Sequence, residues 1–149
     1  MAIFEQTIMV RWADLDPNGH VRHSVYYDYG AQVRINYLHQ QGCSLGWMFR
    51  NRIGPVLFRE EAKFYREINS GDELVVDMRL AGLSADYRKW SIRHQICREG
   101  KLCASLDLDG AWLDLRARTI MVPPQEIMVQ FDNMERTDDF RVIAAGKNA

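Results

Sequence analysis

The sequence predicts an α+β fold in which one antiparallel sheet of five strands wraps around a single long helix. One segment near the N-terminus repeats its apolar residues at helical spacing, whereas five segments alternate apolar and polar residues as strands do. The later strands are joined mostly by short turns, which favours antiparallel neighbours. Because one helix can cover only one face of one sheet, wrapping the sheet around that helix is the simplest arrangement.

The first strand and the helix come at the start of the chain. Residues 3–12 alternate and predict a half-buried strand, and the polar turn 13–22 follows it. A helix is then expected from His23 to Gln41, and Gly42 is placed to end it. The apolar face of this helix consists of Tyr26, Tyr29, Val33 and Tyr37. It is the only long helix that the sequence predicts.

Four more strand-like segments follow the helix. They occupy residues 56–68, 74–80, 90–96 and 102–112. Residues 43–54, which precede them, lack a clear period and are expected to form an irregular loop. This loop carries Trp47, Met48 and Phe49, so it must bury them against its own domain, another subunit or a ligand.

The turn between the last two of these strands has two possible registers. A two-residue loop, Glu99-Gly100, sets the apolar faces of the two strands against each other. A three-residue loop that also includes Lys101 pairs Ile96 with Ala104 and keeps both faces consistent. We expect the second register, which also places Cys97 opposite Cys103 on the outer face.

The strands end at Pro123-Pro124, and residues 125–131 are expected to form a short helical turn. The domain is therefore expected to span residues 1–131. Residues 132–149 are polar and are expected to form a mobile C-terminal tail.

Composition indicates one ordinary globular domain. The chain has 149 residues, 47% of them hydrophobic, and a formal net charge of -1, which gives no reason to expect nucleic acid or an anionic membrane as partner. No stretch approaches the ~20 apolar residues that span a bilayer, and the N-terminus lacks the pattern of a signal peptide. Three cysteines fit neither a metal site nor a disulfide framework, so we expect a cytoplasmic protein with reduced thiols.

The chemistry is concentrated in the turn before the helix. The run Asp14-Leu-Asp16-Pro-Asn-Gly19-His20-Val-Arg-His23 places two carboxylates and two imidazoles beside a helix start. A helix start presents unpaired N–H groups and a positive dipole end, which suit a developing oxyanion. A carboxylate beside such donors could attack a carbonyl carbon or activate water toward it. The turn therefore indicates acyl-transfer chemistry.

Residues 14–34 resemble the signature of hotdog-fold acyl-CoA thioesterases, in particular the group typified by 4-hydroxybenzoyl-CoA thioesterase and the Tol-Pal-associated thioesterases. The pattern is Asp-x-Asp-x-x-Gly-x-Val, often with a His or Tyr next, then a helix Tyr and a downstream Arg. The residues that fill these places are Asp14, Asp16, Gly19, Val21, His23, Tyr26 and Arg34. The likeness covers roughly residues 5–130, because the basic-then-proline ending from Arg116 to Pro124 is also similar.

The resemblance implies a mechanism. Asp16 matches the catalytic carboxylate, which acts as a nucleophile or as a base on water. The residue that matches His23 opens the helix, and its backbone N–H polarises the thioester carbonyl. Many relatives have Asn at the place of Arg22 and Glu at the place of Gly30-Ala31. The missing acidic residue leaves catalysis more dependent on Asp16.

The resemblance also implies partners. The substrate is an acyl-CoA or acyl-carrier-protein thioester, coenzyme A being part of the substrate and not a cofactor. The assembly is a homo-oligomer, either a dimer or a tetramer of two dimers, with the site at a subunit interface.

Each candidate residue has a simpler alternative. Asp16 could only cap its turn, and Asp14 is expected to orient the turn. A metal held by His20, His23 and the two carboxylates is not expected, since one turn gives no rigid ligand frame. His94, on an apolar strand face, is expected to be a hydrogen-bonded core histidine.

Substrate contacts are predicted from aromatic and basic residues. Tyr26, Trp47 and Phe58 are candidate walls of the acyl pocket, although ordinary core packing would also explain them. Arg88 and Lys89, with Arg52, could pair with the phosphates of coenzyme A or simply be solvated surface charges.

Two rival functions remain open. The protein could be an acyl-carrier-protein thioesterase of polyketide or lipid synthesis, or a non-catalytic acyl-CoA binder. A hotdog dehydratase is disfavoured, because the sequence has no His-Phe-Pro segment of the kind those enzymes carry.

Overall fold

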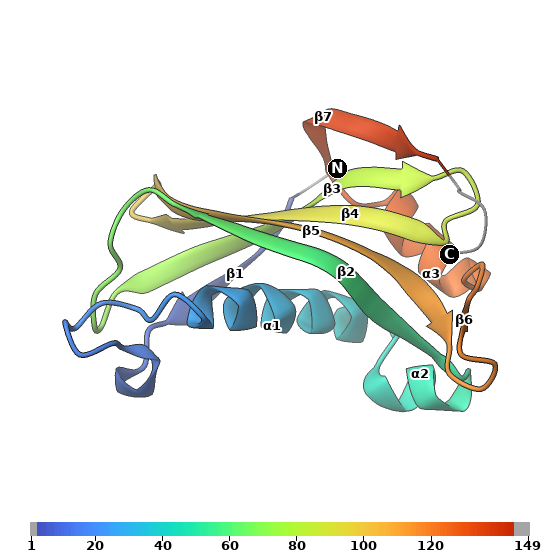
Figure 1. Ribbon diagram of the computed structural model, residues 1–149, viewed down its shortest axis with the longest axis horizontal. Helices are drawn as coiled ribbons and strands as arrows, with labels where there is room; N and C mark the ends of the chain where they lie inside the picture. The colour runs from blue at the N-terminus through green and yellow to red at the C-terminus, as the bar shows by residue number, and fades with distance from the viewer. Residues whose placement is uncertain (1–2, 145–149) are drawn as a thin grey trace.

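A curved sheet covers one long helix in the computed structural model, which describes residues 3–144 (Figure 1). Helix α1 (Val25–Gln40) lies under the sheet, and Gly42 at φ +87° follows its end as predicted. The main strands are β1 (Phe4–Met9), β2 (Ile53–Phe64), β3 (Glu73–Ser84), β4 (Lys89–Arg98) and β5 (Lys101–Asp114). They are antiparallel neighbours in the order β1-β3-β4-β5-β2. The predicted α+β architecture, a hotdog fold, is confirmed.

The core lies between α1 and the concave face of the sheet. Val33 and Tyr37 of α1 are buried, and Leu80, Ile96 and Leu106 of the three central strands are fully buried. Burying one such side chain stabilises the fold by roughly 1.5–3 kcal/mol. This contact fixes the position of α1 under the sheet and therefore fixes where the helix begins.

The β4–β5 hairpin combines features of both registers that the sequence allowed. Its loop has two residues, Glu99 and Gly100, both at positive φ, so the predicted three-residue loop was wrong. A bulge after Ile96 nevertheless restores the predicted pairing of Ile96 with Ala104. As a result Cys97 pairs with Leu102, and Cys103 is fully buried and does not lie on the outer face.

Two short helices flank the sheet. Residues 45–50 form α2 (Leu45–Arg50), so the prediction of an irregular loop there was wrong. The sequence signal for this helix is Ser44, whose Oγ accepts a hydrogen bond of 3.2 Å from the N–H of Trp47 as an N-cap. The predicted helical turn after Pro123-Pro124 is confirmed as α3 (Gln125–Asp132).

The prediction of a mobile C-terminal tail was also wrong for residues 132–144, the part of that segment that the structure describes. Strand β7 (Arg136–Ile143) pairs parallel with β3, and the short β6 (Thr119–Ile120) pairs with β5. Strand β1 covers only the first half of β3, so β7 occupies the other half of the same edge. The C-terminal segment is thus part of the sheet.

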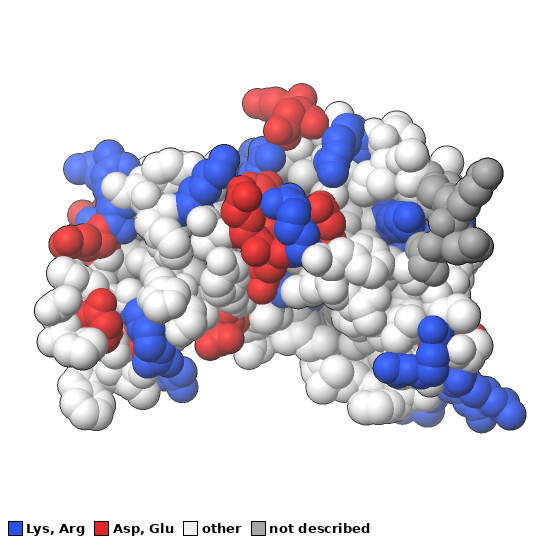
Figure 2. Space-filling model, in the orientation of Figure 1, with Lys and Arg blue, Asp and Glu red and all other residues white. Residues whose placement is uncertain are grey.

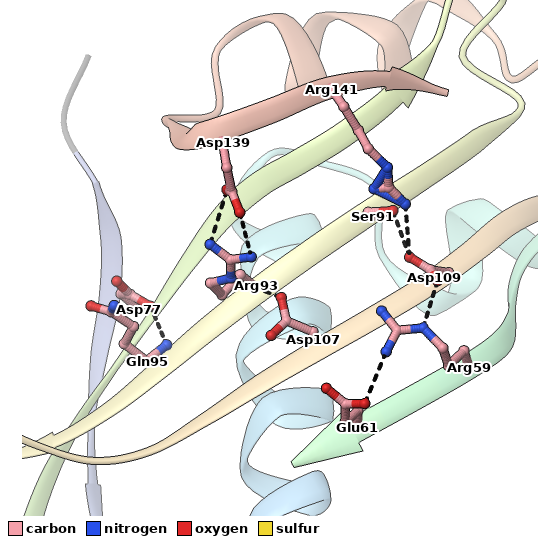
Figure 3. Close-up of polar contacts among 10 residues, drawn as sticks. All are labelled: Arg59, Glu61, Asp77, Ser91, Arg93, Gln95, Asp107, Asp109, Asp139 and Arg141. Carbon is pink, nitrogen blue, oxygen red and sulfur yellow. Dashed lines mark hydrogen bonds and ion pairs between the residues drawn. The ribbon is translucent and has the colours of Figure 1, made fainter. Parts of the chain in front are cut away.

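Charged side chains cover the outer face of the sheet, opposite α1. Figure 2 shows acidic and basic groups side by side over the middle of this face, and Figure 3 shows their contacts. Arg93 on β4 binds Asp107 on β5 at 2.7 Å and both carboxylate oxygens of Asp139 on β7 at 3.0 and 3.1 Å. Arg59 on β2 binds Asp109 at 2.8 Å. The Arg93 contacts tie β7 to the central strands, and the Arg59 contact joins β2 to β5.

Candidate active site

The turn that carries Asp16 is closed by its own hydrogen bonds. Oδ1 of Asp16 accepts the N–H groups of Asn18 at 2.9 Å and His20 at 3.2 Å. The Asp16 N–H donates to the carbonyl of His20 at 2.7 Å, and Gly19 takes the positive φ of 83° that the turn requires. Oδ2 of Asp16 receives no hydrogen bond from residues 3–144. One carboxylate oxygen is therefore anchored while the other stays available.

Helix α1 begins two residues later than predicted, at Val25, whose N–H donates to the carbonyl of Arg22 at 2.9 Å. Ser24 occupies the N-cap position without a side-chain cap bond. The N–H of His23 has no acceptor within the described part of the chain. It is an unpaired donor at the positive end of the helix dipole, as the proposed chemistry requires.

A cleft of about 370 Å³ brings these groups together. The turn 13–22 and the connection from β2 to β3 lie side by side at one end of α1 (Figure 1), joined by a hydrogen bond of 2.8 Å from the Val21 N–H to the Ile68 carbonyl. The residues lining the cleft are Asp16, His20, Val21, His23, Tyr26, Phe64, Tyr65, Arg66 and Glu67. Three predicted site residues, Asp16, His23 and Tyr26, therefore face one space.

The walls of the cleft combine aromatic rings with a contact between a histidine and a carboxylate. The rings of Tyr26 and Phe64 meet edge to face, with centroids 4.9 Å apart. Burial raises the pKa of Tyr26, with neighbouring negative charge such as that of Asp16 adding to the effect, so its hydroxyl stays protonated. Nε2 of His20 lies 3.1 Å from a carboxylate oxygen of Glu67, which ties the turn to the opposite rim.

Asp14 has the structural role expected of it. Its buried carboxylate accepts hydrogen bonds from Nη2 of Arg11 at 2.7 Å and from the Tyr29 hydroxyl at 2.9 Å. Burial alone would raise the pKa of Asp14, but the hydrogen bonds from Arg11 and Tyr29 outweigh it and hold that pKa below its ordinary value. It holds the short 3₁₀ turn Trp12–Asp14 in place before the turn that carries Asp16.

His94 is the hydrogen-bonded core histidine that the sequence predicted. It is fully buried, and its Nδ1–H donates to the Asp77 carbonyl at 2.7 Å. Its Nε2 lies 3.0 Å from Nη1 of Arg34, the last residue of the family signature. Burial, together with the charge of Arg34, lowers the pKa of His94 to about 3, so the ring is neutral.

Four predicted substrate residues do not line the cleft. Trp47 lies in α2, Phe58 is exposed on β2, and Arg88 and Lys89 lie near the start of β4. Arg88 binds the neighbouring Asp86 at 2.7 Å.

Sequence reasoning missed the residues at the end of β2, which form the opposite wall. Phe64, Tyr65, Arg66 and Glu67 all line the cleft. They are more than 35 positions away from the turn along the chain, so no local pattern linked them to it. The one available signal was a pair of adjacent aromatic residues at a strand end, and both are exposed in the structure.

Within residues 3–144, no group of three or more His, Cys, Asp and Glu side chains is arranged to hold a metal ion. None of the helices in this same range is both long and apolar enough to cross a bilayer.

Comparison with known proteins identifies the family. The model of the thioesterase-like superfamily matches residues 10–131, which include the whole cleft. The chain belongs to this superfamily. This thioesterase-like chain is also 28% identical over 137 residues to the chloroplastic acyl-acyl carrier protein thioesterase ATL3 of Arabidopsis thaliana, a match that covers 91% of the chain and 70% of the relative.

Solved structures share the fold of this thioesterase-like protein. The hypothetical protein SAV2348 from Staphylococcus aureus, solved in complex with CoA, has a TM-score of 0.83 at 18% identity, over 91% of this chain and 87% of that one. Slr0204, a 1,4-dihydroxy-2-naphthoyl-CoA thioesterase from Synechocystis, has a TM-score of 0.79 at 18% identity, over 89% and 97% of the two chains. At these identities the likeness establishes the hotdog fold.

Proposed function

We propose that the protein is an acyl-CoA thioesterase of the group typified by 4-hydroxybenzoyl-CoA and Tol-Pal-associated thioesterases. One observation supports this most strongly. The free carboxylate oxygen of Asp16 and the unpaired N–H of His23 belong to residues that line one cleft at the start of α1. Membership of the thioesterase-like superfamily agrees with hydrolysis of a thioester.

The proposed reaction uses two groups of this chain. The His23 N–H donates to the thioester oxygen, and one such donor is typically worth about 3–4 kcal/mol in the transition state. Asp16 either attacks the carbonyl carbon itself, forming an anhydride that water opens, or takes a proton from water that attacks. In both routes the carbon–sulfur bond breaks, the thiolate takes up the proton, and the products are a carboxylic acid and free CoA.

Substrate binding is assigned to the walls of the cleft. Tyr26, Phe64 and Tyr65 contribute aromatic surface beside the thioester, and Arg66 is the one lysine or arginine among residues 3–144 that lines the cleft. We assign contact with a substrate phosphate to Arg66. The reaction as written needs no metal or prosthetic group. We place the protein in the cytoplasm, in keeping with its three free cysteines.

A carrier-protein thioester is the second candidate substrate. The similarity to an acyl-acyl carrier protein thioesterase supports it, and both substrates present the same thioester to Asp16. In the binding-only alternative, the cleft holds the thioester without breaking it.

We also propose a homo-oligomer, a dimer or a tetramer. Strand β2 is an edge of the sheet, pairing within residues 3–144 only with β5. Leu57, Phe58 and Phe64 on this edge are 44%, 59% and 52% exposed, an unusual amount of apolar surface for an unpaired edge strand. Antiparallel pairing of two β2 edges would cover these side chains and bring a second subunit to the cleft.

A thiol-release screen tests the function. Matched acyl-CoA and acyl-carrier-protein esters with aromatic, branched and straight acyl groups are offered to the wild-type protein. Catalysed release of thiol from at least one CoA ester is expected, and faster release from the carrier-protein ester of the same acyl group would favour the second candidate. Tight calorimetric binding of the esters without thiol release from any of them would refute the enzyme and leave the binder.

A further inference from the structure

Arginine side chains gather at the corner of the molecule where helix α2 lies beside the turn between β5 and β6. Figure 2 shows this corner, at the lower right, as a group of basic side chains with few acidic ones beside them. We call its four exposed members the arginine cluster: Arg50, Arg52, Arg116 and Arg118.

Backbone contacts hold the two segments of the arginine cluster together. Ile53 of β2 pairs with Asp114 of β5, and the Leu115 N–H donates to the Arg52 carbonyl at 2.9 Å. The Arg118 N–H donates to the Asp114 carbonyl at 2.8 Å, which closes the turn after β5. Residues that are far apart in the sequence are thereby fixed at one place on the surface.

The positive charge of the arginine cluster is largely unneutralised. None of its guanidinium groups forms an ion pair with a carboxylate of residues 3–144. Asp114 is the one acidic residue in the segments 44–54 and 114–120. Its Oδ1 accepts the backbone N–H groups of Ala117 and Arg116, which lower the pKa of Asp114, and the charges of Arg116 and Arg52 add to this effect. One carboxylate cannot balance four guanidinium groups, so this corner carries net positive charge.

Two apolar side chains project from α2 beside these arginines. Leu45 and Phe49 are 54% and 71% exposed, and their spacing of four residues places them on one face of the helix. Met48, which is only 4% exposed, packs into the core and anchors the helix. Helix α2 is thus fixed to the domain while it presents an apolar pair to its surroundings.

These features fit an anionic lipid surface better than another protein. A stable protein contact involves about 20–30 residues a side, whereas the apolar part of this surface consists of two side chains. A bilayer requires only that a few apolar side chains enter the boundary between headgroups and acyl chains, with basic residues around them. Guanidinium groups also bind phosphate oxygens in bidentate geometry, and every phospholipid headgroup carries a phosphate.

We infer that this corner binds an anionic lipid bilayer, with Leu45 and Phe49 entering the headgroup boundary and the arginine cluster contacting lipid phosphates. The net charge of -1 does not reveal such a surface, because many of the acidic groups lie over the middle of the sheet (Figure 2). Helix α2 and the Asp16 cleft lie at opposite ends of α1 (Figure 1), so the inference does not depend on the proposed thioesterase reaction.

Flotation with lipid vesicles tests the inference on the wild-type protein. Vesicles of phosphatidylcholine and phosphatidylglycerol, at a ratio of about 3:1, are compared with vesicles of phosphatidylcholine alone. We expect the protein to bind the anionic vesicles about tenfold or more tightly than the neutral ones, because several arginines act together. Salt at about 0.5 M should remove most of this difference, since it screens exposed charges.

Matched variants assign the binding to this corner. Arg50→Gln and Arg116→Gln should each weaken binding to the anionic vesicles about fivefold, whereas Lys101→Gln, in the β4–β5 hairpin at the other end of the molecule (Figure 1), should bind like the wild type. Phe49→Gln should weaken binding about tenfold through lost apolar contact. Val142→Gln is its control, since Val142 is 73% exposed on β7.

Hydrogen exchange locates the contact without any substitution. Amides of residues 45–50 and 115–118 are expected to exchange with deuterium more slowly when the anionic vesicles are present. Amides of residues 99–101, in the hairpin at the other end, should exchange at an unchanged rate.

Three results would overturn the inference. The wild-type protein could fail to bind the anionic vesicles, or Lys101→Gln could weaken binding as much as Arg50→Gln, which would reduce it to a general attraction between charges. A lower oligomer mass of Phe49→Gln in light scattering, without vesicle binding by the wild type, would assign this corner to a contact between two copies of the chain. None of these results bears on thioester hydrolysis, which the thiol-release screen tests separately.

Discussion

Gly30 shows how a single residue of α1 is fixed by its surroundings. A Cβ at this position would lie 2.7 Å from Cδ1 of Leu106 and 3.0 Å from Cδ2 of His94, both of them buried. The helix passes so close to the sheet here that no side chain fits. This explains physically why position 30 carries no side chain.

Replacing this glycine should therefore destabilise the protein. Gly30→Ala gains about 1 kcal/mol of helix propensity but forces overpacking, which typically costs 1–3 kcal/mol, so a net lowering of Tm is expected. Gly46→Ala in the exposed helix α2 is the matched control, since its Cβ would approach only the flexible end of Arg50 within 3.4 Å. It should be neutral or stabilising by about 0.5–1 kcal/mol. Equal Tm changes in both variants would contradict the close packing at Gly30.

His94 should make stability depend on acid pH. The ring titrates at about 3 in the fold and near 6.5 when unfolded, so it is neutral in both states above pH ~6.5. As the pH falls from ~6.5 toward ~3, His94 binds a proton in the unfolded chain but stays neutral in the folded protein. Stability is then lost at up to about 1.4 kcal/mol per pH unit.

Denaturant unfolding between pH 7 and about 4.5 measures this effect. His94→Gln should show a shallower loss of stability than the wild type, whereas His39→Gln, at an exposed position on α1, should match it. Parallel curves for the wild type and His94→Gln would mean that the buried ring does not titrate as described.

At the scale of elements, strand β7 is held in the sheet by side-chain contacts as well as by its few backbone pairs with β3. Only four β3–β7 residue pairs are in register, with an irregularity between Leu80 and Gly82. Asp139 supplements them by binding Arg93 through both oxygens, and the hydrogen bonds from Arg93 lower the pKa of Asp139 to about 2. The carboxylate therefore stays charged over the physiological range.

Asp139→Asn should loosen β7 without disturbing the rest of the sheet. Amides of residues 136–143 are expected to exchange with deuterium several-fold faster, because the charge-assisted contact is lost. Asp138→Asn, at a neighbouring exposed position, provides the control and should exchange like the wild type. If the two variants were indistinguishable, the ion pair would not hold the strand.

The elements differ in how well sequence alone predicts them. Long periodic segments, such as α1 and the five main strands, follow directly from their hydrophobic spacing. Strand β7 was not predicted because residues 132–144 are mostly polar. Its partner is the half of the β3 edge that β1 does not cover, and this partner is far away in the sequence. The length of the β4–β5 loop was predicted wrongly because the bulge after Ile96 keeps the pairing of Ile96 with Ala104, which a two-residue loop would otherwise prevent.

At the scale of the molecule, the exposed edge strand β2 is the feature that most requires a partner. Phe58→Lys places a charge in the proposed subunit contact and should shift a dimer or tetramer toward the monomer in light scattering. Val142→Lys is the matched control, since Val142 is 73% exposed on β7, away from this edge. A wild-type protein that stays monomeric at high concentration would contradict the proposed assembly.

The candidate site was only half predictable. The turn and the helix start are local in sequence, so the signature around Asp16 and His23 pointed to one wall of the cleft. The opposite wall, from Phe64 to Glu67, comes from the end of β2 and the connection after it, far from the turn in sequence. A local pattern carries no information about such a distant contact, and the sequence pointed instead to Trp47, Phe58, Arg88 and Lys89.

The account as a whole depends on Asp16, and the turnover of Asp16→Asn tests it most directly. Asparagine keeps an oxygen that can accept the N–H groups of Asn18 and His20, so the turn and the Tm should be preserved. Loss of the negative charge should lower kcat for the best acyl-CoA ester by well over tenfold, whereas Asp28→Asn, exposed in the first turn of α1, should keep the rate within about threefold. Hydrolysis by a folded Asp16→Asn variant at close to the wild-type rate would contradict the assignment.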